Sequence, residues 1–102
     1  MVSPAERTLH TVLPNVLVIR GEIDLASCQA VGKLLLDQLH AVDGDLRIDL
    51  SEVSFFAAVG VRMLLEAADV ARHRGVTLRI GPVSPSVSMA LHATGAWHLL
   101  CS

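Results

Sequence analysis

Apolar residues recur with two different periods along the 102-residue chain, and these periods predict strands that alternate with helices. Short aliphatic runs at 9–13 and 16–19 are separated by Pro14-Asn15, which predicts a hairpin. The second run, Val-Leu-Val-Ile, is typical of a strand buried on both faces. Apolar and polar residues alternate over 45–51, as in a strand with one face in water. A fourth strand is expected over 76–83.

Three helices are predicted after these strands. The first follows Asp24, a candidate N-cap, and ends at Asp43-Gly44; the second runs from the junction at 57–60 to Gly75. The third begins at Ser84-Pro85, since Ser caps a helix well and Pro suits its first turn. Each helix carries an apolar stripe expected to face inward. In chain order these stripes are Cys28, Val31, Leu35, Leu39 and Val42; Val61, Leu64, Leu65, Ala68 and Ala71; and Val87, Ala90, Leu91 and Thr94. Trp97, Leu99 and Leu100 are expected to fold back onto the body.

The element order β-β-α-β-α-β-α predicts an α/β fold with a small mixed β-sheet. Strands joined through helices pair in parallel with right-handed crossovers, and the initial hairpin adds an antiparallel pair. Because the strands keep polar residues on one face, the helices are expected to pack on one side of the sheet only. The chain length fits a single domain over 1–102, with residues 1–7 as a loose lead-in.

Composition narrows the classes of partner. The net charge is −2 and no basic run is present, which argues against nucleic acid as a partner. No apolar run is long enough to span a bilayer and no signal sequence is evident, so the prediction is a cytoplasmic protein without direct membrane insertion. Cys28 and Cys101 lie far apart without a paired cluster, so both are expected to be plain buried thiols.

No residue set for catalysis is evident, and the prediction is a protein that is not an enzyme and holds no metal or cofactor. The histidines are scattered, and only Asp69 and His73 have an i,i+4 spacing, which is read as a solvated helix-face contact. Neither a glycine-rich phosphate loop nor a nucleophile elbow is present.

Three segments together resemble the STAS domain, the family of bacterial anti-sigma factor antagonists and their relatives in transporter tails and stress complexes. They are GEIDLAS after a buried strand, DLSEVSFFAAVGVRMLLEA in the middle, and GPVSPSVSMALHATG after the last strand. The resemblance covers residues 15–99, and the middle segment is its most specific part. It implies the small mixed sheet with helices on one side that the periodicity also predicts.

The resemblance also implies a phosphate switch at the start of the second helix. Family members that act as phosphoswitches carry Asp-Ser-Ser-Gly or Asp-Ser-Thr-Gly there, and a cognate kinase phosphorylates the first Ser. In this chain the four positions are Ala57, Ala58, Val59 and Gly60, so Ala58 replaces the acceptor and Ala57 the acidic residue. Asp24 matches the family's other acidic position. Without a hydroxyl, Ala58 cannot be phosphorylated.

The resemblance implies a non-enzymatic interaction module that binds an anti-sigma factor with a serine-kinase fold and is held in its unmodified state. The alternative that the switch site has decayed stays open, as do a scaffold in a stress-signalling complex, an accessory subunit of a membrane transporter, and a homodimer. The predicted contact surface combines an apolar patch at the helix start with neighbouring polar residues. Its members are Asp24, Ser27, Phe56, Ala57, Ala58, Val59, Gly60, Arg62, Glu66 and Asp69.

Overall fold

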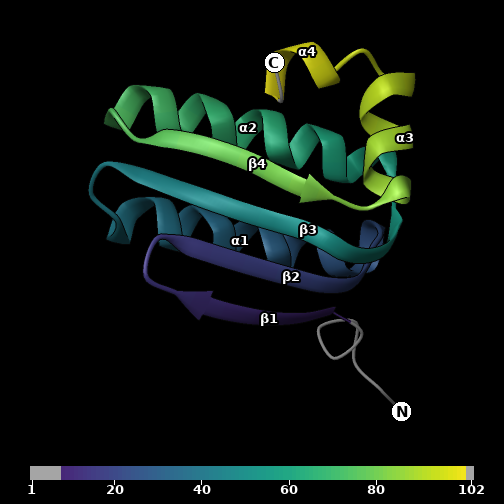
Figure 1. The fold of residues 1–102 in the computed structure, drawn as a ribbon, viewed down its shortest axis with the longest axis horizontal. Coiled ribbons are helices and arrows are strands. Elements are labelled where there is room, and N and C mark those ends of the chain that lie inside the picture. Colours follow the sequence, from purple (N-terminus) through teal and green to yellow (C-terminus); the bar gives the residue numbers. More distant parts are fainter. Residues whose placement is uncertain (1–7, 101–102) are drawn as a thin grey trace.

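The computed structural model describes residues 8–100 and confirms the predicted α/β class. Four strands and three helices follow one another in the expected order, and a short fourth helix, which the periodicity does not predict, comes after them (Figure 1). Their bounds are β1 Thr8–Leu13, β2 Val16–Ile23, α1 Leu25–Ala41, β3 Asp45–Phe56, α2 Ala58–Arg74, β4 Thr77–Val83, α3 Pro85–Ala93 and α4 Trp97–Leu100. The loose lead-in predicted for residues 1–7 and the burial predicted for Cys101 lie outside the described residues.

The sheet has the strand order β1-β2-β3-β4. β1 and β2 form the predicted antiparallel hairpin, and Asn15 takes a positive φ of 62° in its two-residue turn. Asn tolerates this left-handed conformation better than other residues with a side chain, apart from Asp. β2, β3 and β4 pair in parallel through α1 and α2. Their carboxyl ends therefore meet at one edge of the sheet, where α1 and α2 begin.

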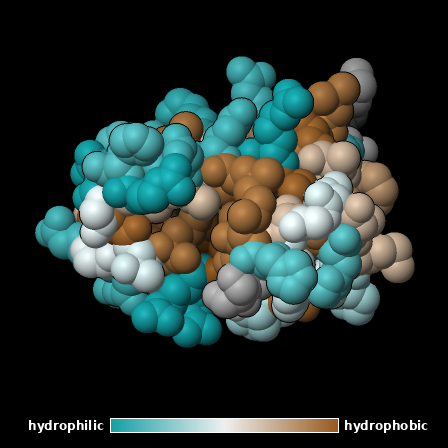
Figure 2. Space-filling model, turned by 90° about the horizontal axis from the view of Figure 1, so that it is seen from above, coloured by the Kyte–Doolittle hydropathy of each residue, from teal (hydrophilic) through white to brown (hydrophobic). Residues whose placement is uncertain are grey.

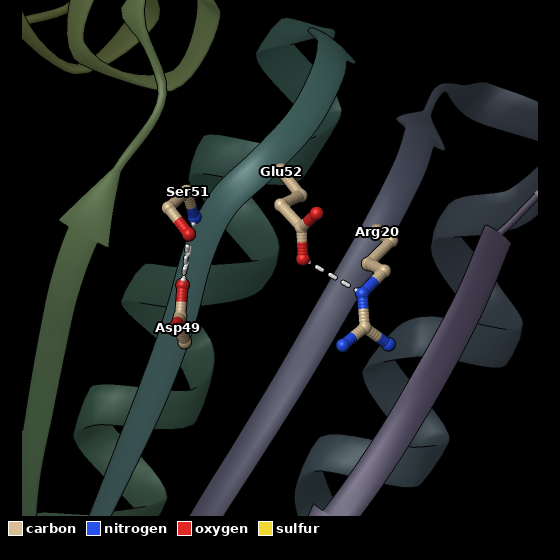
Figure 3. A network of polar contacts seen from close by, with 4 residues as sticks. All are labelled: Arg20, Asp49, Ser51 and Glu52. Atoms are coloured by element: carbon tan, nitrogen blue, oxygen red, sulfur yellow. Dashed lines mark hydrogen bonds and ion pairs between the residues drawn. The ribbon is translucent and has the colours of Figure 1, made fainter.

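Both long helices lie side by side on one face of the sheet, as predicted, and the opposite face is open (Figure 1). Leu17 and Ile19 point into the core, whereas Val16 and Val18 on the open face are only half-buried. The expectation that this strand is buried on both faces is therefore wrong, because no helix covers its second face. That face carries polar contacts, among them the Arg20–Glu52 ion pair at 2.7 Å between β2 and β3 (Figure 3).

β3 alternates as predicted up to Leu50 and then departs from a period of two. Its pairing with β2 shifts twice, between Val18 and Arg20 and between Gly21 and Glu22. Each shift inserts an extra residue into β3, as a β-bulge does. As a result Ser51 and Glu52 are both exposed, and the strand continues to Phe56.

The helix stripes lie close to the predicted ones, with two corrections. Thr94 is exposed, because α3 ends at Ala93 and Thr94 is its C-cap; the expectation that it faces inward is therefore wrong. The second correction is in α2. Leu65 is exposed, and Met63 and Ala67 are buried in its place, which turns the inward stripe toward α1. α1 and α2 pack directly against each other, so α2 needs buried residues on that flank as well as on the sheet side. Asp24 and Ser84 cap their helices as predicted, and Gly75 ends α2 with a positive φ of 72°.

The chain closes with α3 at the end of the sheet and α4 above α2 (Figure 1). Trp97 and Leu100 pack against the core, and Trp97 stacks on His92 with ring centroids 4.4 Å apart. Leu99 is 75% exposed, so the expectation that it folds onto the body is wrong. Seen from above, from the side of α4, apolar side chains gather over the middle of this surface (Figure 2).

Candidate functional site

The start of α2 lies at the carboxyl edge of the sheet and has no side-chain cap. Ala57 occupies the N-cap position and makes no side-chain hydrogen bond. Its own N–H donates to the carbonyl oxygen of Ile23 at 2.9 Å, and the N–H of Gly60 donates to the carbonyl oxygen of Ala57 at 2.8 Å. No acceptor for the N–H groups of Ala58 and Val59 is found among residues 8–100. The helix therefore presents two open donors and the positive end of its dipole at this edge.

Gly60 allows α2 to approach the end of β3 closely. A Cβ atom at this position would lie 2.8 Å from Cε1 and Cζ of Phe56 and 3.2 Å from Cγ2 of Ile23. Carbon atoms in contact sit about 3.5 to 4.0 Å apart. Any side chain at position 60 would thus push α2 away from the strand that precedes it.

Asp24 and Ser27 form a capping box at the start of α1, beside the start of α2. The N–H of Ser27 donates to Asp24 Oδ1 at 2.9 Å, and the N–H of Asp24 donates to Ser27 Oγ at 3.0 Å. Ser27 Oγ also lies 2.9 Å from the carbonyl oxygen of Glu22, an acceptor for its hydroxyl. Because Ser27 is 1% exposed, it supports the helix end from beneath and presents no side chain to a partner.

The exposed apolar surface at this edge differs from the predicted patch. Phe56 is 6% exposed and packs under Gly60, so the expectation that it forms part of an exposed patch is wrong. Its neighbour in sequence, Phe55, is 49% exposed, and Leu25 at the start of α1 is 80% exposed; both lie at the same edge of the sheet as the exposed Ala58. The sequence partly indicates the exposure of Phe55, because adjacent strand residues point to opposite faces and so only one residue of the Phe55-Phe56 doublet can face the core. Nothing in the sequence distinguishes Leu25 from a core leucine.

The predicted polar residues are spread along α2 rather than gathered at its start. Arg62 and Glu66 are exposed one and two turns from the helix start and line the groove between α1 and α2. Asp69 follows about 16 Å along the helix from Ala58, at 1.5 Å per residue. It forms an ion pair with Arg72, and its carbonyl oxygen lies 2.8 Å from His73 Nδ1. The Asp69 and His73 side chains are both solvated, at 54% and 73% exposure.

Cys28 links the two helix starts. It is 7% exposed, and its Sγ donates to the carbonyl oxygen of Val59 at 3.6 Å. Burial, and to a lesser extent the negative charges of Glu66 and Asp24, raise the pKa of this thiol above its ordinary value of 9.0. The thiol is therefore protonated at neutral pH, which makes it a poor nucleophile and a poor metal ligand. Within the described part of the chain, no group of three or more His, Cys, Asp or Glu residues is placed to hold a metal ion.

Two exposed hydroxyl groups lie on β3 upstream of the Ala58 position. Ser54 Oγ lies 3.3 Å from the carbonyl oxygen of Gly21, a long hydrogen bond. Ser51 Oγ donates to Asp49 Oδ1 at 2.6 Å on the open face of the sheet (Figure 3). α3 closes this region, since Ser86 Oγ donates to the carbonyl oxygen of Ser54 at 2.9 Å. Both hydroxyl groups belong to β3, so neither lies at the first position of α2, where the family's acceptor serine would be.

Comparison with known families identifies one match over most of the chain. A family model described as "Mlab, STAS domain" matches residues 10–101. A search of curated proteins returned no match. Over residues 8–100, no helix combines the length and apolar character needed to cross a membrane.

Solved structures with the same fold include two anti-sigma factor antagonists. One, from Mycobacterium paratuberculosis, is 25% identical; the match covers 91% of this chain and 80% of that one, with a TM-score of 0.70. The other, SpoIIAA in its unphosphorylated form, is 17% identical, with 86% and 80% covered and a TM-score of 0.68. A third match, to a structure of Mglu, is 16% identical and covers 76% of this chain but 20% of that one, at a TM-score of 0.57.

Proposed function

The chain belongs to the STAS domain family, and we propose that it is a non-enzymatic interaction module that binds an anti-sigma factor. This class of function is supported by the fold that the chain shares with two antagonists and by its 25% sequence identity to one of them. The observation that carries the proposal is the start of α2. There Ala58 is exposed and the helix end has no side-chain cap, at the same edge of the sheet as the exposed Leu25 and Phe55.

This surface suits a protein partner in a state that needs no modification. A phosphate at a helix start would add a charge of about −1.5 to −2 and would repel an acidic or apolar partner. Ala58 offers no hydroxyl to accept it, and the exposed apolar residues at this edge of the sheet lose water-exposed area when a partner covers them. The proposed partner is an anti-sigma factor with a serine-kinase fold, which this surface binds constitutively.

Ala58→Glu in the full chain tests the location of the surface. A Glu at the first helical position is compatible with the positive dipole end, so the variant is expected to fold with unchanged stability or a small gain. It imitates the charge that a phosphate would bring, and we expect binding to a purified anti-sigma kinase from the same genome to weaken at least about tenfold, or 1.4 kcal/mol. Isothermal titration calorimetry measures the affinity of the wild type and of the variant directly.

Ala41→Glu is the matched control, because it makes the same change at an exposed alanine at the far end of α1. Its affinity should equal that of the wild type. Equal affinities for Ala58→Glu and the wild type would place the interface elsewhere. An absence of binding by the wild type would remove the antagonist proposal and favour a scaffold or a transporter subunit.

A further inference from the structure

An open groove runs between α1 and α2 on the side of the helices that faces away from the sheet. Its volume is about 1160 Å³, and its floor includes Gly32, Val59 and Met63. Leu36, 37% exposed, and Leu25, 80% exposed, stand on its α1 bank. These exposed apolar side chains would lose contact with water if another molecule covered the groove.

Two contacts define the relative register of the helices along this groove. Cys28 Sγ donates to the carbonyl oxygen of Val59, 31 residues further along the chain. A Cβ on Gly32 would lie 3.4 Å from Cγ of Met63, which is again 31 residues further. Since both helices follow parallel strands, each residue of α1 lies level with the α2 residue numbered 31 higher.

The charges on the two banks have the same order. On α1, Lys33 and Asp37 are spaced i,i+4, with Nζ 3.0 Å from Oδ2. On α2, Arg62 and Glu66 have the same spacing and line the same groove. The register places the midpoints of the two pairs within about 3 Å of each other along the helix axis. Within each pair, the cation lies nearer the amino end of its helix and the anion nearer the carboxyl end.

We propose that this groove is the interface of a homodimer in which α1 and α2 pack antiparallel on the same helices of a second copy. The twofold axis lies in the interface, perpendicular to the two helices, and passes over the middle of the groove. It therefore reverses the direction of both helices at once. Lys33 then faces Asp37 of the second copy, and Arg62 faces its Glu66. The same operation brings the exposed Leu36 near Gly32 of the second copy, which has no side chain of its own there, beside Met63.

The energetics of this interface make it weak. The Lys33 and Asp37 side chains are 78% and 62% exposed, so exchanging their pair within one chain for pairs between chains costs little. Two helices about 25 Å long and about 10 Å wide offer roughly 500 Å² per copy. Stable complexes bury about 800 Å² per partner, so the dimer is expected to form only at tens to hundreds of micromolar. Its affinity should fall as salt screens the charges.

Self-association requires no other protein, so the homodimer stands independently of the proposed function. One consequence does rest on the proposed function. Because the dimer covers Arg62 and Glu66, it competes with the partner that is proposed to contact them. Lys33 and Asp37 lie outside the proposed partner surface, so variants at these two positions report on the dimer alone.

Sedimentation velocity on the full chain tests the proposal over about 5 to 500 µM, the range in which a weak interface associates. The wild type should shift from monomer to dimer. Lys33→Glu and Asp37→Lys each place two like-charge contacts in the dimer, and each should weaken it about tenfold or more. An equimolar mixture of the two variants should dimerise again, because the glutamate introduced at position 33 of one chain then faces the lysine introduced at position 37 of the other.

The mixture separates contacts between chains from effects within one chain, since mixing changes nothing inside either monomer. Arg47→Glu, on the open face of the sheet, is the matched charge control and should dimerise like the wild type. A wild type that stays monomeric over the whole range overturns the proposal. So does undiminished dimerisation of both variants, and so does a mixture that fails to restore it.

Discussion

Replacement of the two glycines that lie within long helices by alanine tests the packing at the start of α2. Gly32 lies in α1 and Gly60 in α2, and alanine is favoured over glycine in a helix by about 1 kcal/mol. At Gly32 the new methyl would lie 3.4 Å from the flexible Met63 side chain, an ordinary contact. Gly32→Ala is therefore expected to raise the free energy of unfolding by about 1 kcal/mol.

At Gly60 the same methyl would lie 2.8 Å from the ring of Phe56, which is held in the core. Overpacking of this kind costs roughly 1 to 3 kcal/mol, which exceeds the gain in helix propensity. Gly60→Ala should therefore lower the free energy of unfolding by about 1 kcal/mol. The two variants then differ by about 2 kcal/mol, or roughly 10 °C in Tm for a domain of this size.

Urea unfolding at low micromolar protein concentration measures the free energy of unfolding of each variant. It is followed by circular dichroism and by the fluorescence of the single tryptophan, Trp97. A double-mutant cycle with Phe56→Leu locates the cause, because the penalty at Gly60 should shrink once the ring edge is gone. If Gly60→Ala stabilised the protein as much as Gly32→Ala, the account of a glycine required by close packing would be refuted.

Two further predictions concern the start of α1. Asp24→Ala removes the acceptor of the capping box and should lower the free energy of unfolding by about 1 kcal/mol, measured by urea unfolding; a change below about 0.3 kcal/mol would contradict the cap's role. In a Cys101→Ser background, the raised pKa of Cys28 predicts that the midpoint of thiolate formation, followed by absorbance at 240 nm, lies above pH 9.0. Because the folded state favours the neutral thiol, its contribution to stability is present below the ordinary pKa and is lost as pH rises through the raised pKa. Thiolate formation below pH 8 would contradict this.

The sequence predicts most element ends because the signals for them are local. Asp24, Ser84 and Gly75 act within one helical turn of their own positions, so the caps follow from residue type. The antiparallel hairpin, the parallel pairing of the later strands and the one-sided helix layer follow from the alternation of periods and from the polar positions in the strands. These features need no knowledge of distant contacts.

The features that sequence reasoning missed depend on which elements meet. The bulges in β3 arise from its pairing with β2, and no pattern within residues 51–56 marks them. Met63 replaces Leu65 in the core because α2 packs against α1 as well as the sheet, and the apolar period alone does not reveal that second neighbour. Val16 and Val18 look like core residues until the absence of a covering helix is known.

The residues at and near the start of α2 fall into two groups: some are needed for packing within the domain, and others are exposed and available to a partner. Phe56 and Gly60 are buried against each other, so the fold itself accounts for them without any partner. Ala58, Phe55 and Leu25 are exposed, and the packing of the domain gives no reason for apolar side chains there. The glycine that carries part of the family resemblance is thus accounted for by structure, while the claim to a binding surface rests on the exposed residues. Binding experiments therefore discriminate only when they alter the second group, because a change in the first group would weaken any function by weakening the fold.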